Sequence, residues 1–288
     1  KLPIANFPLI PVADGAGEIV AMADDVTGLS VGERVIPHFM PDWLDGPICS
    51  EKLAKMRGIN LPGSVVEYVA VPATSLVKVP EHLSYVQAAS LPVAATTAWN
   101  AMQVTRLDTR SKVLISGTGG VSIFALQFAK AAGAEVIITS SSEEKLARAK
   151  ALGADHLINY KSDPDWLRRI TDISAGRGID LVIDTVGGEN FLHSLELAAM
   201  GGAVFTVGFL NGQHCQLDLM QIIAKALRVY GNNTGSVADL RSATNYIAQH
   251  RLQPQIDKIY SSREIATAYA DLTAGGRHFA KLGLALDF

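Results

Sequence analysis

Four consecutive residues, Gly117, Thr118, Gly119 and Gly120, form a glycine-rich run of the kind that binds phosphate groups. Gly117 would allow a tight turn, and Gly119 would let backbone amides approach a pyrophosphate closely. A helix beginning near Gly120 and Val121 would add free N–H groups and the positive end of its dipole. Without such a helix the run would be an ordinary turn. The flanking segments therefore decide whether it is a dinucleotide site.

The segments around this run have the required pattern. Residues 112–116 form a short apolar strand, and residues 121–132 place their apolar side chains on one helical face. Gly133 stands where a left-handed helix cap is expected, and residues 135–139 form the next strand. Ser122 replaces the third glycine of the usual fingerprint and is still small. The order of strand, turn, helix and strand predicts a dinucleotide-binding unit.

The alternation of strands and helices continues through the middle of the chain. Ser141 and Glu144 predict a capping box for a helix that ends at Gly153. Six strands joined by helical crossovers predict an α/β fold with a doubly wound parallel sheet, the Rossmann arrangement, over residues 89–235. The four strands that complete this set are residues 156–160, 179–184, 203–208 and 227–231.

The two ends of the chain have a different texture. Residues 1–88 are rich in Gly, Pro and short β-branched runs, and they predict a β-rich domain. The clearest of these runs are residues 17–20, 34–36 and 65–70. Residues 236–288 predict two helices and two short strands, which would most simply complete one of the other domains.

The end of the second strand predicts which cofactor binds. NAD-specific units usually carry a carboxylate there for the ribose hydroxyls, whereas residues 139–142 are all hydroxyl side chains. Hydroxyls can donate to a 2′-phosphate, and Lys145 and Arg148 can supply positive charge. We therefore predict NADP(H). NAD(H) remains the alternative, in which Glu143 or Glu144 reaches the ribose.

The rest of the cofactor is expected at the carboxyl ends of the strands. Segments with glycine follow strands four, five and six and would allow close approach to the nicotinamide ring, although each could be a plain turn. Tyr160, after strand three, would stack near the adenosine. The predicted cofactor-binding residues are Thr97, Gly117, Thr118, Gly119, Gly120, Val121, Ser140, Ser141, Lys145, Tyr160, Val186, Gly208, Phe209, Leu210, Gly235 and Ser236.

The composition excludes several classes of protein. The 288 residues are 48% hydrophobic and 18% charged, which predicts a folded chain of two domains. A formal net charge of -3 disfavours a nucleic-acid partner. Cys49 and Cys215 are too few for a disulfide framework, which favours a cytoplasmic protein. No apolar run reaches the roughly 18 residues of a membrane helix, so no membrane association is expected.

Several stretches together resemble the medium-chain dehydrogenase/reductases. They are residues 11–20, 31–35, 91–99, 117–122 and 149–156, and the likeness extends over nearly the whole chain. The chain is most similar to the zinc-free, quinone-reductase-like branch of the alcohol dehydrogenase homologues. These motifs are specific for the superfamily and are poor guides to the substrate.

The resemblance implies a GroES-like catalytic domain built from both chain ends, residues 1–88 and 236–288. It also implies that a further segment normally precedes residue 1 and contributes to the substrate pocket. Members of the family commonly form homodimers through edge strands, here residues 203–208 or 227–231.

The resemblance also bears on zinc. The His-Glu pair of the zinc-dependent relatives falls at Ala13 and Asp14, and their later Cys ligand falls at Val93. Neither alanine nor valine can bind zinc. The lobe that holds four cysteines in such relatives offers only Cys49. We therefore predict no metal, and we interpret Asp14 as a turn residue in preference to one that holds a pocket loop.

Without a metal, hydrogen-bond donors or water must meet the negative charge that hydride transfer leaves on oxygen. The predicted pocket walls are His38, Phe39, Trp43, Thr97 and Phe209, which could instead be ordinary packing residues. No catalytic acid is assigned. The predicted function is NADPH-dependent reduction of a quinone, enone or related small carbonyl substrate. The alternatives are a zinc-independent alcohol or aldehyde dehydrogenase, and a nucleotide-binding module with little turnover.

Overall fold

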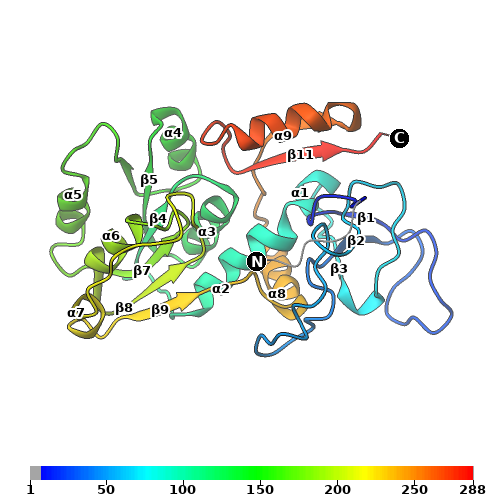
Figure 1. Ribbon diagram of the computed structural model, residues 1–288, viewed down its shortest axis with the longest axis horizontal. Coiled ribbons are helices and arrows are strands. Elements are labelled where there is room, and N and C mark those ends of the chain that lie inside the picture. The colour runs from blue at the N-terminus through cyan, green and yellow to red at the C-terminus, as the bar shows by residue number, and fades with distance from the viewer. Residues whose placement is uncertain (1–7, 288) are drawn as a thin grey trace. The chain divides into compact units, whose positions relative to one another are not determined.

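The computed structural model describes residues 8–287 of the chain, which divides into two units (Figure 1). One unit consists of Lys1–Thr96 and Thr234–Phe288, and the other consists of Thr97–Asn233. The chain thus leaves the first unit once, forms the second, and returns. Within the described part of the chain, no helix is both long enough and apolar enough to cross a membrane.

The second unit is built on a six-stranded parallel sheet with the strand order β6-β5-β4-β7-β8-β9. Along the chain, β5 and β6 are added on one side of β4, and β7, β8 and β9 are then added on its other side. This change of side beside β4 is the arrangement of a Rossmann fold and confirms the predicted fold class. The strands are β4 (Lys112–Ser116), β5 (Glu135–Ser140), β6 (His156–Asn159), β7 (Ile179–Asp184), β8 (Ala198–Thr206) and β9 (Arg228–Gly231).

Helices flank this sheet, as Figure 1 shows. Helix α3 (Gly120–Ala131) packs on β4 and β5, and α6 (Asn190–Leu197) packs on β7 and β8. The other helices of the unit are α2 (Thr96–Gln103), which begins at the unit boundary, α4 (Glu143–Ala151), α5 (Trp166–Ile173) and α7 (Met220–Ile223). The strands carry nearly continuous apolar runs because parallel sheets are covered on both faces.

The core of this unit joins neighbouring strands. Leu114, Ile137, Val182 and Val204 come from β4, β5, β7 and β8, and each exposes 2% of its surface or less. The segments that follow these buried strands all lie at the carboxyl ends of the strands. The packed core of the sheet therefore positions the candidate cofactor residues in these segments.

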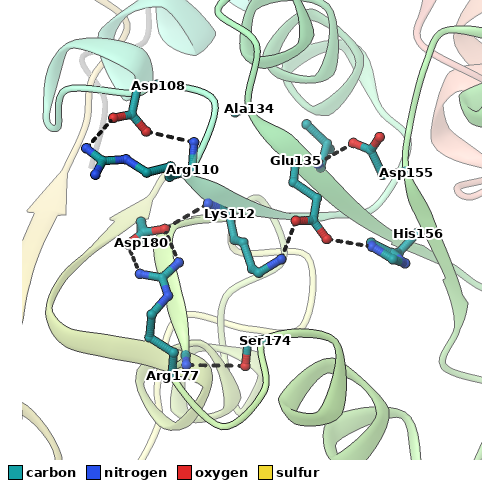
Figure 2. A network of polar contacts seen from close by, with 12 residues as sticks. Asp108, Arg110, Lys112, Ala134, Glu135, Asp155, His156, Ser174, Arg177 and Asp180 are labelled. Carbon is teal, nitrogen blue, oxygen red and sulfur yellow. Dashed lines mark hydrogen bonds and ion pairs between the residues drawn. The ribbon is translucent and has the colours of Figure 1, made fainter.

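A polar network lies at the amino ends of the parallel strands, opposite the end that carries the candidate cofactor residues (Figure 2). Glu135 accepts hydrogen bonds from Lys112 and, at 2.7 Å, from His156 Nε2. Asp180 accepts from the Lys112 backbone N–H at 2.7 Å and binds Arg177 through two contacts of 2.6 and 2.7 Å. The bond from Lys112 holds the pKa of Glu135 below its usual value. These pairs link the first residues of β4, β5 and β6 with the second residue of β7.

The first unit carries two small sheets. One has β1 (Gly17–Glu18), β2 (Arg34–Pro37) and β3 (Leu76–Lys78) paired antiparallel, and the other has β10 (Ile256–Ser261) and β11 (Lys281–Ala285) paired parallel. Its helical elements are α1 (Tyr85–Ala89), a π-helical stretch at Leu91–Ala95, α8 (Val237–Gln249), α9 (Ile265–Thr273) and the short turns Ala73–Ser75 and Ser262–Glu264.

Three local predictions were wrong. Residues 65–70 form no strand, because no neighbouring described strand pairs with them, and Tyr68 is 66% exposed. The N-cap of α4 is Ser142, whose hydroxyl accepts from the Lys145 backbone N–H at 3.4 Å, and Ser141 does not cap it. Residues 203–208 lie mostly in β8, which pairs with β7 and β9 on its two sides, so β8 is not an edge strand and the two edge strands are β9 and β6.

Candidate active site

The glycine-rich turn leads directly from β4 into α3. Gly117 has a φ of +76°, a left-handed conformation that glycine adopts without strain. Gly119 is the N-cap of α3, and no side chain caps this 12-residue helix. A Cβ placed on Gly119 would meet no atom within 4 Å. The first backbone N–H groups of α3 are therefore available to an anion such as a pyrophosphate.

Two side-chain hydroxyls bind the last residue of β4, directly before the glycine-rich turn. Ser122 Oγ donates to the Ser116 carbonyl oxygen at 2.9 Å, and Thr185 Oγ1 donates to the same oxygen at 2.6 Å. Ser122 is 1% exposed. A serine thus fits the position of the third glycine, because its hydroxyl binds the preceding strand. Thr185 belongs to the segment after strand four that was expected near the nicotinamide, but its hydrogen bond to the end of β4 was not predicted, since the two residues come from different strand ends.

A buried carboxylate organises the turn after β7. Asp184 is fully buried, and its Oδ1 accepts from the Val186 N–H at 2.9 Å, the Gly187 N–H at 3.0 Å and Asn190 Nδ2 at 2.9 Å. The Asp184 carbonyl accepts from the Gly208 N–H at 3.2 Å. Val186 and Gly208, both predicted to lie against the nicotinamide, are therefore held by one residue that the sequence analysis missed.

Backbone packing explains one glycine in this region. A Cβ on Gly208 would overlap the Thr185 carbonyl group, so the segments after β7 and β8 can approach only without a side chain there. The next two residues point outward, since Phe209 is 65% exposed and Leu210 is 84% exposed. Both side chains are accessible at the carboxyl edge of the sheet.

The end of β5 carries the predicted phosphate-recognising residues. Ser140 is buried and its Oγ accepts from the Ser142 N–H at 3.3 Å, whereas Ser141 is exposed. Tyr160 donates its backbone N–H to the Ser140 carbonyl at 3.2 Å and leaves its ring half exposed. Glu143 Oε1 accepts from Asn159 Nδ2 at 2.6 Å. One of the two acidic side chains that could have approached the ribose is thereby engaged elsewhere.

The structure divides the other predicted residues between the units. Thr97 is 2% exposed in α2 of the second unit, and Lys145 is 9% exposed in α4. Gly235 and Ser236 belong to the first unit, where Ser236 caps α8 and its hydroxyl donates to Asp239 at 2.7 Å. Ser236 is therefore also a structural residue. The cofactor roles of all these residues stay predictions.

Two of the three predicted aromatic pocket residues, Phe39 and Trp43, lie together in the first unit, whereas Phe209 belongs to the second. Phe39 and Trp43 form an apolar cluster with Met40 and Met56, and each of the four exposes 8% of its surface or less. Trp43 Nε1 donates to the Gly46 carbonyl at 2.9 Å. These residues are well packed, and any contact with a substrate would use only a small part of their surface.

His38 precedes this cluster and is fully buried. Its Nδ1 lies 2.9 Å from the Met40 carbonyl oxygen and 3.0 Å from the Met40 N, so that it donates to the one or accepts from the other according to its tautomer, and its Nε2 has no hydrogen-bond partner among the described residues. Burial lowers the pKa of His38 to about 4. The imidazole is therefore neutral near neutral pH and cannot serve there as a positive electrostatic donor.

The positions where zinc-dependent relatives carry ligands do not fit a zinc ion. Ala13 and Val93 both pack against the apolar cluster. Asp14 Oδ1 accepts from the Val93 N–H at 3.1 Å, and Asp14 Oδ2 accepts from Lys281 Nζ at 2.6 Å. Residues 8–287 contain no group of three His, Cys, Asp or Glu side chains placed to hold a metal.

The interpretation of Asp14 as a mere turn residue was wrong, because its carboxylate joins the π-helical stretch and β11 to its own loop. Lys281 was not recognised from the sequence, since it lies at the far end of the chain. The absence of a metal stays a prediction.

A Rossmann sheet with an open phosphate turn is the arrangement of a dinucleotide-binding fold, and here it is joined to a β-containing unit made from both chain ends. Residues 1–81 match the family model of the alcohol dehydrogenase GroES-like domain. Residues 120–249 match the family model described as a zinc-binding dehydrogenase.

Similar proteins point the same way. A zinc-type alcohol dehydrogenase-like protein of Schizosaccharomyces pombe is 37% identical over 99% of this chain and 84% of its own length. A solved NAD-dependent alcohol dehydrogenase has a TM-score of 0.87 at 29% identity, over 98% of this chain and 84% of that one. A 2-octenoyl-CoA carboxylase reductase, solved with NADP and 2-octenoyl-CoA, has a TM-score of 0.85 at 26% identity, over 96% and 68%. The chain belongs to the medium-chain dehydrogenase/reductase superfamily of oxidoreductases.

Proposed function

We propose that this protein is a zinc-independent, NADPH-dependent reductase of a quinone, an enone or a related carbonyl compound. The single observation that carries the proposal is the uncapped N-terminus of α3 behind the left-handed Gly117. This arrangement presents free backbone N–H groups and a positive helix end, which are what a dinucleotide pyrophosphate binds. The open space above Gly119 leaves room for that group.

The preference for NADPH is supported by the end of β5. The exposed Ser141 can donate a hydrogen bond to a 2′-phosphate, and Lys145 and Arg148 bring positive charge to the same helix. Glu143 is bonded to Asn159, which leaves it poorly placed to accept from a ribose hydroxyl. One structural relative was solved with NADP, and another is named as NAD-dependent. The dissociation constants of NADPH and NADH therefore provide the first test of the cofactor preference.

The proposal of metal-free chemistry rests on Ala13, Asp14 and Val93. Two of these residues have no donor atom, and the third is neutralised by Lys281. NADPH supplies a hydride when it is bound, and the protein positions it. The chain contributes the backbone amides of α3 for the pyrophosphate. It also contributes Asp184, which accepts hydrogen bonds from the backbone N–H groups of Val186 and Gly208 and so positions the two turns. The group that delivers the proton is not assigned to a residue.

The cofactor preference is tested by placing a carboxylate at the end of β5. In Ser141→Asp, the new charge would repel a 2′-phosphate and accept from the ribose hydroxyls of NADH. We expect NADPH binding to weaken about tenfold or more and NADH binding to improve, as judged by cofactor fluorescence titration. Ser141→Asn is the matched control without the charge. Tighter binding of NADH than of NADPH by the unmodified protein would contradict the preference.

Turnover is tested with full-length protein, NADPH and three classes of acceptor: quinones, enones and aldehydes. We expect oxidation of NADPH with quinones or enones, at a rate that a zinc chelator does not change. Zinc that copurifies in stoichiometric amount and is needed for activity would refute the metal-free mechanism. NADPH binding without turnover of any acceptor would favour a nucleotide-binding module.

We further propose that the protein forms a homodimer through β9, one of the two edge strands of the parallel sheet. An unpaired edge presents free backbone N–H and C=O groups that a second copy can bind. Sedimentation of the unmodified protein and of a variant with proline at Val229 tests this proposal. A monomer at micromolar concentration would rule it out.

A further inference from the structure

Arg57 is a buried cation without a protein counter-ion. Only 3% of its surface is exposed, and no carboxylate in the described part of the chain forms an ion pair with it. Its backbone N–H binds the Phe39 carbonyl at 2.9 Å, and its Nη2 donates to the Gly63 carbonyl at 3.2 Å and to Ser64 Oγ at 3.4 Å. Its Nε is buried and has no hydrogen-bond partner among residues 8–287.

This state is energetically unusual for an arginine. A guanidinium remains charged at every physiological pH, even though burial lowers the pKa of Arg57 from its usual value. Burying a charge without an opposite charge is strongly destabilising in proteins. The two long hydrogen bonds to neutral oxygens offset part of that cost. A ligand with an opposite charge would offset far more.

The surroundings place Arg57 against the loop that carries Asp14. A Cβ on Gly58 would lie 2.8 Å from the backbone of Val12 and of Ala13, so the two segments are in direct contact. Ser64, which accepts from Arg57, packs so closely on Gly15 that a side chain there would overlap it.

Two features of this loop and of the residues packed near it are typical of a ligand-binding site. Val12 has a φ of +71°, a strained conformation for a β-branched residue and one that is often kept for function. The Arg57 backbone binds Phe39, a member of the apolar cluster that includes Trp43. Arg57 therefore combines a positive charge with apolar neighbours, beside the loop that contains Val12 and Ala13.

The charge balance favours a ligand with one negative charge. Asp14 is neutralised by Lys281, and Asp42 is paired with Lys55 at 3.1 Å, so neither is available to Arg57. The described residues give Arg57 a single uncompensated positive charge beside an apolar cluster. A planar carboxylate matches a guanidinium in shape and charge, whereas a phosphate dianion would leave a negative charge beside apolar side chains.

We propose that Arg57 binds a carboxylate group of the acceptor substrate, so that the enzyme reduces a carboxylate-bearing enone or keto acid. This inference rests on the proposed reductase function. The carboxylate is not consumed: hydride from NADPH and a proton from solvent add across the C=C or C=O bond, and NADPH becomes NADP⁺. Arg57 orients the acceptor and takes no part in proton or hydride transfer.

The test compares an oxo-alkenoate with its methyl ester, which lacks the negative charge and carries one additional methyl group. We expect the unmodified full-length protein to reduce the acid with a KM about tenfold to a hundredfold below that of the ester. Arg57→Gln should raise the KM for the acid by that factor and leave the KM for the ester and for NADPH nearly unchanged. Arg57→Lys, which keeps the charge and loses the planar fork, should fall between.

Arg34→Gln is the matched control. Arg34 lies in the same unit, donates to the Leu83 carbonyl and stacks on Tyr85 at 4.6 Å, so its loss should affect both acceptors equally. An equal effect of Arg57→Gln on acid and ester, or no effect on either, would show that Arg57 is only structural and would overturn the proposal. If Arg57→Gln does not fold, the KM ratio of acid to ester in Arg57→Lys decides in the same way.

A binding measurement separates this proposal from the reductase function. Crotonate is titrated into the unmodified protein and the Arg57→Lys and Arg57→Gln variants, with Trp fluorescence as the signal. We expect saturable binding that weakens in this order and that the methyl ester does not reproduce. Crotonate binding of equal strength in all three proteins overturns the role of Arg57. Absence of NADPH turnover with every acceptor would refute the reductase function instead, and the titration would still decide the carboxylate site.

Discussion

Lys281 Nζ donates to Asp14 Oδ2 at 2.6 Å, although the two residues are 267 positions apart in the chain. The lysine begins β11, and the aspartate lies in the loop before β1. The same carboxylate accepts from the Val93 N–H. One side chain thus joins three distant segments of the first unit, at the place where zinc-dependent relatives carry the carboxylate that supports their metal.

We predict that removing either partner of this pair destabilises the protein. Lys281→Met should lower the free energy of unfolding by about 1–3 kcal/mol, less than for a fully buried pair because the side chains are 24% and 16% exposed. Urea denaturation measures the effect. Lys281→Arg is the control that keeps the charge. The double variant Asp14→Asn/Lys281→Met should lose less than the sum of the single changes, and strict additivity would show that the pair contributes nothing.

The elements of the second unit were predictable because their signals are local. The glycine run, the helical stripe behind it and the apolar strands all lie within short windows, and together they determined the Rossmann order. The first unit was less predictable. Residues 65–70 contain the β-branched side chains typical of a strand, yet a strand forms only where a neighbour pairs with it, and no window of sequence reports that neighbour.

The residues of the candidate site also divide into those that local sequence predicts and those that it does not. Gly117 and Gly119 were found because the glycine spacing and the strand and helix that flank it all lie within one short stretch of sequence. Arg57 and Lys281 were missed because their meaning depends on which charges surround them after folding. An arginine looks the same in the sequence whether it is solvated, paired or buried alone.

A methyl group at Gly119 should weaken cofactor binding without harming the fold. The site of the new Cβ has no protein atom within 4 Å, so Gly119→Ala should unfold like the unmodified protein, within about 0.5 kcal/mol. The methyl would instead meet the pyrophosphate, and we expect NADPH binding to weaken about tenfold or more. Gly231→Ala is the control, since its Cβ also has open space but lies on β9. Equal effects of the two changes on NADPH binding would contradict the phosphate turn.

His38 should make stability depend on pH. Its pKa falls from 6.5 to about 4 on folding, chiefly because burial disfavours the charged ring. The unfolded chain then binds the extra proton between these values, so stability is complete above pH 6.5 and is lost as the pH falls toward 4. We expect a loss of about 2 kcal/mol between roughly pH 7 and pH 5 from this residue. His38→Gln should remove that part of the slope, as followed by urea denaturation at each pH; a slope equal to that of the unmodified protein would refute it.

Asp184 should be needed both for stability and for cofactor binding. Asp184→Ala removes the acceptor of three hydrogen bonds in a fully buried site, which should cost about 3 kcal/mol of unfolding free energy. The turn that carries Val186 would lose its anchor, so NADPH binding should weaken as well. Asp184→Asn keeps one carbonyl oxygen for the same donors and should lose much less of both.

The control for the aspartate change is Asp172→Ala, an exposed position on α5. Urea denaturation and NADPH titration on the same preparations give the two readouts. If Asp184→Ala binds NADPH as tightly as the control at a temperature where both are folded, then the turn after β7 does not touch the cofactor. The anchoring role of the carboxylate would then be purely structural, because its hydrogen bonds would stabilise the sheet without shaping the nicotinamide side of the site.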